Sequence, residues 1–203
     1  GAGEPGTPLA GETRQDGREL RTLVDSIKVA GNLAEARKRL ALPAAVGSLD
    51  GLLADPDTDF WRFCFSLPEN NQPEEPAQLE FLRGAYAHVM GRTAYEGIAE
   101  SMTSTATDHP FASILNAARK VVFSRTLTTA DWANTTIAGG DTTEEVDKLR
   151  QGGDGYIVVW GGVELWRSLM RLDLLDELQV SMFPYIAGEG TRLFDGVPTS
   201  YAL

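Results

Sequence analysis

Residues 156–166 read Tyr156-Ile157-Val158-Val159-Trp160-Gly161-Gly162-Val163-Glu164-Leu165-Trp166. A short β-branched run ends in two glycines and an amphipathic pattern follows at once. This predicts a buried strand that turns tightly into the N-terminus of a helix. Because glycine leaves the backbone amides uncovered, such a turn suits a phosphate of a nucleotide cofactor. A Gly-Gly pair after a strand is also compatible with a plain tight turn.

Two other predicted strands end in groups of the same kind. Gly91-Arg92-Thr93 begins a predicted helix after one apolar run, and Ser124-Arg125-Thr126 follows the apolar run at 120–123. An arginine can pair with a phosphate through two parallel hydrogen bonds, although an arginine at a helix start is more often an ordinary surface residue. Because parallel strands place ligands at their carboxyl ends, we expect the three turns to meet in one crevice. The sequence contains neither a Gly-x-Gly-x-x-Gly fingerprint nor a Walker lysine motif, which disfavours the Rossmann and P-loop routes.

Predicted strands and helices alternate along the chain. The strands are predicted at 39–46, 86–90, 120–123, 135–137, 156–160 and 177–184, with the start of another at 191–194. The helices are predicted at 76–85, from 91 onward, at 111–118, at 142–150 with a threonine cap, and at 163–172. This order predicts an α/β fold with a mostly parallel central sheet flanked by helices and an antiparallel C-terminal edge.

The remaining segments are a polar loop and an N-terminal extension. Residues 55–76 are predicted to form a long loop of the kind that serves as a lid or an interface, and it holds an aromatic cluster of Phe60, Trp61, Phe63 and Phe65. Residues 1–37 are predicted to be an extension, disordered at first and then helical, before a single domain at 38–203. Pro43 favours a bulge or an edge position in the first strand.

The composition limits the possible partners. The net charge is −11 and the pI is near 4.6, so a polyanion such as DNA or RNA would be repelled. One cysteine, Cys64, and two histidines, His88 and His109, make no recognisable metal set. No apolar run approaches the roughly 20 residues that span a bilayer, and no charged-then-apolar leader is visible. We therefore expect a cytoplasmic protein without nucleic-acid, membrane or metal partners.

Several short motifs occur in the order of a known family. They are Gly47-Ser48-Leu49-Asp50-Gly51, Met90-Gly91-Arg92-Thr93-Ala94-Tyr95-Glu96, Val122-Phe123-Ser124-Arg125-Thr126-Leu127, Trp160-Gly161-Gly162, and a tail with Leu174-Leu175-Asp176-Glu177-Leu178, Phe183-Pro184-Tyr185-Ile186-Ala187-Gly188-Glu189-Gly190 and Leu193-Phe194. Over about residues 40–194 the chain resembles the dihydrofolate-reductase-like superfamily. Within it, the chain is similar to the branch that contains the reductase domain of bacterial riboflavin biosynthesis. The resemblance implies the same α/β sheet and an NADPH site.

The resemblance also implies roles for the turn residues. The adenosine phosphates, the 2′-phosphate included, would be held by the two polar turns, which contribute Gly91, Arg92, Thr93, Ser124, Arg125 and Thr126. Gly161-Gly162 would approach the pyrophosphate and the nicotinamide, and Ala45-Val46-Gly47 would lie along the nicotinamide. Trp160 departs from the family, in which this position is more often small. It is expected to narrow the nicotinamide pocket, to stack on a ligand or to fill the core.

The implied reaction is hydride transfer from NADPH to a C=N or C=O bond of a small heterocyclic substrate, pterin-like or pyrimidine-like, in a homodimer. Asp50 is a candidate acid or substrate anchor, or it only stabilises its turn. Glu75, next to Glu74, is the other candidate acid, or the two are a favourable charge pair at a helix start, and water can also deliver the proton. Trp61 is expected to stack on the substrate or to pack in the core. The alternatives are a non-catalytic small-molecule binding or resistance protein on the same fold, and a structural dimer whose N-terminal helices recruit a partner.

Overall fold

The chain forms strands and helices that alternate. The computed structural model describes residues 40–55, 58–66, 76–104, 110–153 and 155–197, so the predicted extension at 1–37 lies outside the described residues. In chain order the elements are β1 (Leu40–Ser48), α2 (Asp59–Ser66), α3 (Pro76–Arg83), β2 (Ala87–Gly91), α4 (Arg92–Thr103), α5 (Pro110–Ala117), β3 (Lys120–Phe123), β4 (Thr135–Ala138), α6 (Thr142–Gln151), β5 (Ile157–Trp160), α7 (Val163–Arg171) and β6 (Glu177–Phe183). The strands predicted between residues 39 and 184 agree with these bounds to within two residues at each end.

The strands of the described residues form one sheet in the order β4-β3-β2-β5-β1-β6, and every neighbouring pair is parallel. This confirms the predicted α/β architecture with a parallel central sheet. The antiparallel C-terminal edge is not found in these residues, because α7 carries the chain back across the sheet before β6 begins beside β1. Antiparallel pairing is limited there to two isolated bridges, Gly47–Leu53 and Leu52–Arg192, and residues 193–196 form a turn instead of the predicted strand.

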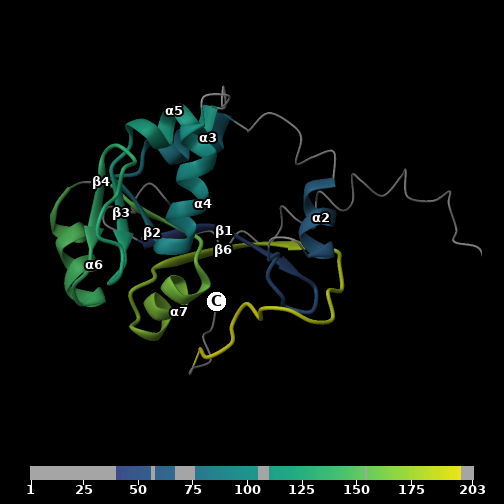
Figure 1. Cartoon of the computed structure of the whole chain (residues 1–203). Coiled ribbons are helices and arrows are strands. Elements are labelled where there is room, and N and C mark those ends of the chain that lie inside the picture. The colour runs from purple at the N-terminus through teal and green to yellow at the C-terminus, as the bar shows by residue number, and fades with distance from the viewer. Residues whose placement is uncertain (1–39, 56–57, 67–75, 105–109, 154, 198–203) are drawn as a thin grey trace, which may run out of the picture.

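Helices cover both faces of the sheet. One face packs against α6 and α7 through buried residues such as Val89, Val159 and Leu169. The other face packs against α3, α4 and α5 through residues such as Met90 and Val158. Because successive side chains of a strand point to opposite faces, the central strands are apolar on both sides, as their continuous β-branched runs predict. Figure 1 shows α3, α4 and α5 together above the sheet and α7 below it.

β1 parts from β5 toward the carboxyl end of the sheet. The two strands pair only at the start of β1, through Leu40 and Ala41. Beyond that point β1 pairs with β6 alone, and its register shifts between Leu42 and Ala45, around Pro43. Of the two positions that Pro43 favours, an edge or a bulge, the structure fits the second, because β1 lies inside the sheet and its register is irregular there. The connection from β1 to β2 contains α3 and the connection from β5 to β6 contains α7. These two helices pack on opposite faces, so this parting is a topological switch point of the sheet.

The predicted loop at 55–76 contains a helix, α2, which is a correction to the sequence reading. Thr58 caps it, since the Thr58 Oγ1 accepts from the Trp61 backbone N–H at 3.1 Å. Phe60 and Cys64 lie one turn apart and are both buried against Phe183 of β6. Figure 1 places α2 to the right, near the ends of β1 and β6. Phe60 and Phe63 of the predicted aromatic cluster therefore pack from α2 against Phe183 and Tyr185. The amphipathic pattern of α2 is too short to be recognised among its polar flanks.

The predicted threonine cap of the helix at 142–150 is also wrong. The N-cap of α6 is Asp141, whose Oδ1 accepts from the Thr143 amide at 2.9 Å and from the Glu144 amide at 3.2 Å. A carboxylate at this place satisfies two free amides and adds a favourable charge at the positive end of the helix dipole.

Candidate functional site

Three turns meet at the carboxyl edge of the sheet. They follow β2, β3 and β5, and β2 pairs with both of the other strands. Gly91 lies beside Phe123 in the register, directly before the turn at 124–126. The backbones of Gly91 and Gly162 also approach closely, since a Cβ built on Gly162 would lie 3.8 Å from the Gly91 Cα. The structure therefore brings together the three segments that the sequence singled out.

The helices α4 and α7 both begin at this edge without a capping side chain. Their N-caps are Gly91 and Gly162, and neither makes a side-chain cap hydrogen bond. The first amides of a helix have no partner within the helix and lie at the positive end of its dipole. Gly162 has a φ of 91°, which glycine adopts without strain. A Cβ built on Gly161 would meet nothing within 4 Å, so the backbone there is open to a ligand.

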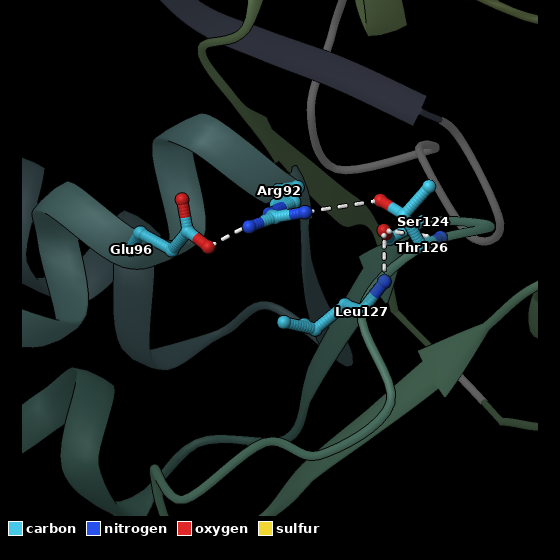
Figure 2. Close-up of polar contacts among 5 residues, drawn as sticks. All are labelled: Arg92, Glu96, Ser124, Thr126 and Leu127. Atoms are coloured by element: carbon cyan, nitrogen blue, oxygen red, sulfur yellow. Dashed lines mark hydrogen bonds and ion pairs between the residues drawn. The ribbon is translucent and has the colours of Figure 1, made fainter.

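Arg92 links two of the three turns, as Figure 2 shows. Its Nη1 donates to the Thr126 Oγ1 at 3.1 Å, and its Nε donates to the Glu96 Oε1 at 2.7 Å. The Ser124 Oγ accepts from the Leu127 amide at 3.0 Å and holds the second turn in shape. About half of each side chain in the Arg92–Glu96 ion pair is exposed, so the pair is worth only about 0.3–0.5 kcal/mol. A phosphate can therefore compete for this guanidinium at little cost.

Glu96 was not among the predicted site residues. The signal that could have found it is its spacing, because residues four apart on a helix face each other. Glu96 occupies the Nε side of Arg92, and Thr126 occupies part of the Nη1 side. The guanidinium has five N–H donors in a planar fork, so several remain for an anion. Thr93 follows Arg92 in the chain and Arg125 precedes Thr126, and both side chains are exposed.

Asp50 ties two loops together at the carboxyl ends of β1 and β6. Its Oδ1 accepts from the Ser48 Oγ at 2.6 Å and from the Ala187 amide at 3.0 Å, and its Oδ2 accepts from the Gly188 amide at 2.7 Å. These hydrogen bonds, that of Ser48 first, lower the pKa of Asp50 to about 2. The carboxylate is therefore ionised at neutral pH, which disfavours a role as a proton donor in this arrangement. Its part in the reaction stays a prediction.

A hollow of about 330 Å³ lies beside α2 and the segment after β6. Two aromatic rings line it, Phe60 and Tyr185, which stack with centroids 5.1 Å apart. Its polar lining is mostly acidic and consists of Asp55, Thr58, Asp59, Arg62 and Glu189. Trp61, which the sequence suggested for stacking on a substrate, is on α2 but does not line the hollow. The aromatic lining of this hollow thus comes from Phe60 and Tyr185, neither of which was among the predicted substrate residues.

Trp160 ends β5 and turns its indole onto the face covered by α3, α4 and α5. The indole Nε1 donates to the Nδ1 of His88 at 2.8 Å. His88 is fully buried, and this burial is the main reason why its pKa is lowered to about 4. The Lys120 charge lowers the pKa further, whereas a hydrogen bond with the Leu82 backbone raises it. The imidazole is therefore neutral at pH 7, with its Nδ1 as acceptor. From the sequence, Cys64 and the two histidines make no recognisable metal set, and no role was assigned to His88.

The other predicted site residues are placed as follows. Ala45 and Gly47 lie on β1, where they pair with Val180 and Met182 of β6. A Cβ on Gly47 would come within 3.1 Å of the Met182 Sδ, so close packing alone already favours glycine there. Glu75 lies outside the described residues, and nothing is assigned to it.

Two other properties of the described residues bear on the class of site. None of the helices there is long and apolar enough to cross a membrane. No three His, Cys, Asp or Glu side chains in that part of the chain gather where they could hold a metal ion. Cys64 is buried, and burial raises the pKa of its thiol to about 11, so it is not a reactive nucleophile.

The fold is α/β, and three polar or glycine-rich turns lie at the carboxyl ends of its parallel strands, the edge at which such sheets bind ligands. Residues 43–202 match the family model of the RibD C-terminal domain, and the chain belongs to this family. This confirms the branch expected from the sequence, that of the reductase domain of bacterial riboflavin biosynthesis.

Three relatives illustrate the match. The protein YyaP of Bacillus subtilis strain 168, described as uncharacterised, is 35% identical over 89 residues, which are 43% of this chain and 46% of that protein. A crystal structure from Shewanella sp. PV-4, named for riboflavin biosynthesis, is 21% identical with a TM-score of 0.62 and coverage of 80% of this chain and 85% of that one. The Thermotoga maritima diaminohydroxyphosphoribosylaminopyrimidine deaminase/5-amino-6-(5-phosphoribosylamino)uracil reductase is 19% identical with a TM-score of 0.52, over 81% of this chain and 50% of that one. The chain thus spans about half the length of the first and the third of these proteins.

Proposed function

We propose that this chain is a reductase that uses NADPH to reduce a C=N or C=O bond of a small heterocyclic substrate, pterin-like or pyrimidine-like. One observation carries the proposal. Arg92, the Ser124–Thr126 turn and the uncapped start of α7 at Gly162 lie at one edge of the sheet. The family match supports it, and so does the Thermotoga maritima relative, whose name includes a uracil reductase.

The described residues fit the parts of this dinucleotide. The exposed guanidinium of Arg92, with Thr126 beside it, suits the 2′-phosphate, and Thr93 and Arg125 add a hydroxyl and a charge. The bare amides at the starts of α4 and α7 suit the pyrophosphate. In this proposal the nicotinamide would lie at the parting between β5 and β1, near the open Gly161 backbone and the Ala45–Gly47 segment. When bound, the cofactor supplies the hydride, and the protein supplies orientation and charge.

The proton must come from elsewhere than the Asp50 shown in the structure. Both of its oxygens accept hydrogen bonds and its pKa is about 2. We therefore assign Asp50 to anchoring the 187–188 segment beside the substrate, and the proton to water or to Glu75. The same engagement of Asp50 is the observation that favours the alternative, a binding or resistance protein on this fold without turnover.

The decisive binding experiment compares Arg92→Ala with wild type in titrations with NADPH and NADH. Loss of charge-assisted hydrogen bonds to the 2′-phosphate is expected to weaken NADPH binding by roughly tenfold to hundredfold. Binding of NADH, which lacks that phosphate, is expected to change less than about twofold. Arg83→Ala is the matched control, since Arg83 is exposed in the last turn of α3, before the amino end of β2.

Two results would count against the proposal. If wild-type protein binds NADPH and NADH equally, the 2′-phosphate has no role in recognition. If Arg83→Ala weakens NADPH binding as much as Arg92→Ala does, the effect of Arg92 is one of general surface charge. Oxidation of NADPH across a panel of pterins and pyrimidines then separates the two functions. Turnover supports the reductase, whereas tight heterocycle binding without turnover supports the binding protein.

We also infer that the chain forms a homodimer. β6 is an edge strand, and two exposed apolar side chains lie next to its carboxyl end, Leu49 at 61% and Ile186 at 67% exposure. They are neighbours, because the Leu49 amide donates to the Tyr185 carbonyl at 2.9 Å. Sedimentation velocity of the full chain measures the assembly, and a monomer at every concentration would rule the dimer out.

A further inference from the structure

His88 and Trp160 form a buried polar pair that the proposed cofactor site does not require. The histidine is the second residue of β2 and is fully buried, and its Nδ1 accepts from the Trp160 indole N–H at 2.8 Å. The imidazole lies beside buried Lys120 of β3 in the register, and removing it from water costs free energy that its hydrogen bonds have to offset. A leucine at position 88 would fill a similar volume without this desolvation cost. The hydrogen-bonded pair of His88 and Trp160 therefore calls for an explanation.

The hydrogen bond sets the direction of the indole. Trp160 lies level with Met90 in the β2–β5 register, whereas His88 lies level with Val158, two residues nearer the amino end of the sheet. The indole N–H therefore reaches back along the sheet, away from the carboxyl edge. Trp160 is at the same time the residue that precedes the open backbone of Gly161, at the border of the parting between β5 and β1. Its ring is only partly buried there.

We propose that His88 is a positioning residue that holds the Trp160 indole back from the parting between β5 and β1, and so keeps open the place where a flat ring lies against Gly161. This inference rests on the proposed function, because the ring in question is the nicotinamide or the heterocyclic substrate. Tryptophan is the largest side chain that this position could carry. Without a tether, rotation about its side-chain bonds would bring the indole over the glycine backbone.

The first measurement tests the hydrogen bond without any ligand. The chain has four tryptophans, and the indole N–H resonance of Trp160 is assigned as the one lost in Trp160→Phe. His88→Leu removes the acceptor and is expected to shift that resonance and speed its exchange with water. His88→Asn keeps an acceptor near the position of Nδ1 and is expected to restore it. A resonance that does not move in His88→Leu overturns the proposal, since the tether would not exist in solution.

The second measurement tests whether the tether acts on binding. His88→Leu is expected to weaken NADPH binding by about threefold to tenfold, the range of one lost hydrogen bond. In the Trp160→Phe background there is no indole to hold, so the same substitution is expected to change the NADPH affinity less than about twofold. Unchanged affinity in His88→Leu, or an equal loss in both backgrounds, overturns the positioning role. Wild-type protein that binds no NADPH sinks the proposed function and this inference with it.

The matched control is another indole hydrogen bond outside the site. The Nε1 of Trp132 donates to the Oδ1 of Asn116 at 2.6 Å, next to Lys120 at the start of β3. Asn116→Leu is expected to move the Trp132 resonance and leave NADPH binding within about twofold of wild type. If Asn116→Leu weakens binding as much as His88→Leu does, the effect is general loosening of the core and the proposal fails.

Discussion

Acid is expected to destabilise the protein through His88. The folded state holds this imidazole neutral down to a pKa of about 4, whereas its ordinary value is 6.5. As the pH falls from 6.5 toward 4, the unfolded chain takes up a proton that the folded chain refuses, so the free energy of unfolding decreases. The stabilisation present above pH 6.5 is thus lost through this window. The full effect is about 3 kcal/mol, and about 2 kcal/mol is already lost at about pH 5. A typical domain has only about 5–15 kcal/mol in total.

Urea unfolding of wild type and His88→Asn at about pH 7.5 and about pH 5 measures this effect. Asparagine does not titrate, and the two proteins share every other titrating group. The carboxylates therefore largely cancel in the difference between them. Wild type is expected to lose about 2 kcal/mol relative to the variant over this range, or roughly 4–8 °C in Tm. A difference that stays constant within about 0.5 kcal/mol would refute the reasoning, because the histidine would then titrate alike in both states.

Other substitutions test the loop anchor and the glycine turn. Asp50→Ala is expected to speed hydrogen exchange at the Ala187 and Gly188 amides, whose acceptor it removes, and unchanged exchange rates would show that another contact holds the loop. Gly162→Ala is expected to cost about 1–3 kcal/mol of stability by denaturant unfolding, because its φ of 91° strains any other residue. A Cβ added at Gly161 meets no neighbour and Gly161 has no positive φ, so Gly161→Ala is expected to leave the Tm of the free protein unchanged. It is expected to reduce the rise in Tm that NADPH causes. A large loss of Tm in the free variant would show that the Gly161 backbone is not open.

Much of the fold could be predicted from local patterns. The run at 120–123 is bounded by turn residues and became β3 with those limits, and the β-branched run before Gly161 became β5. Residues buried on both faces of a sheet need such continuous apolar runs. The segment at 55–76 failed because its one short helix, α2, lies among polar residues, and its apolar face is defined only by contact with β6.

The site was predictable in its parts. Gly91-Arg92 and Ser124–Thr126 could be predicted as candidate anion-binding turns because their chemistry is local, and the structure places the two turns side by side. The partners of these side chains could not. Arg92 contacts Thr126 from 34 residues away, and Trp160 contacts His88 from 72 residues away. Neither separation along the sequence corresponds to a helical or strand period, so no local pattern predicts these two contacts.

By itself the sequence determined where the six strands and most of the helices form, because propensity and hydrophobic period act over a few neighbouring residues. The tertiary structure alone decided the order β4-β3-β2-β5-β1-β6, the parallel direction of β6 and the parting between β5 and β1. It also decided that Asp50 accepts hydrogen bonds from Ala187 and Gly188, more than 130 positions along the chain. These contacts depend on which strand ends become neighbours. That choice is made by burial of the whole apolar core and not by any one segment.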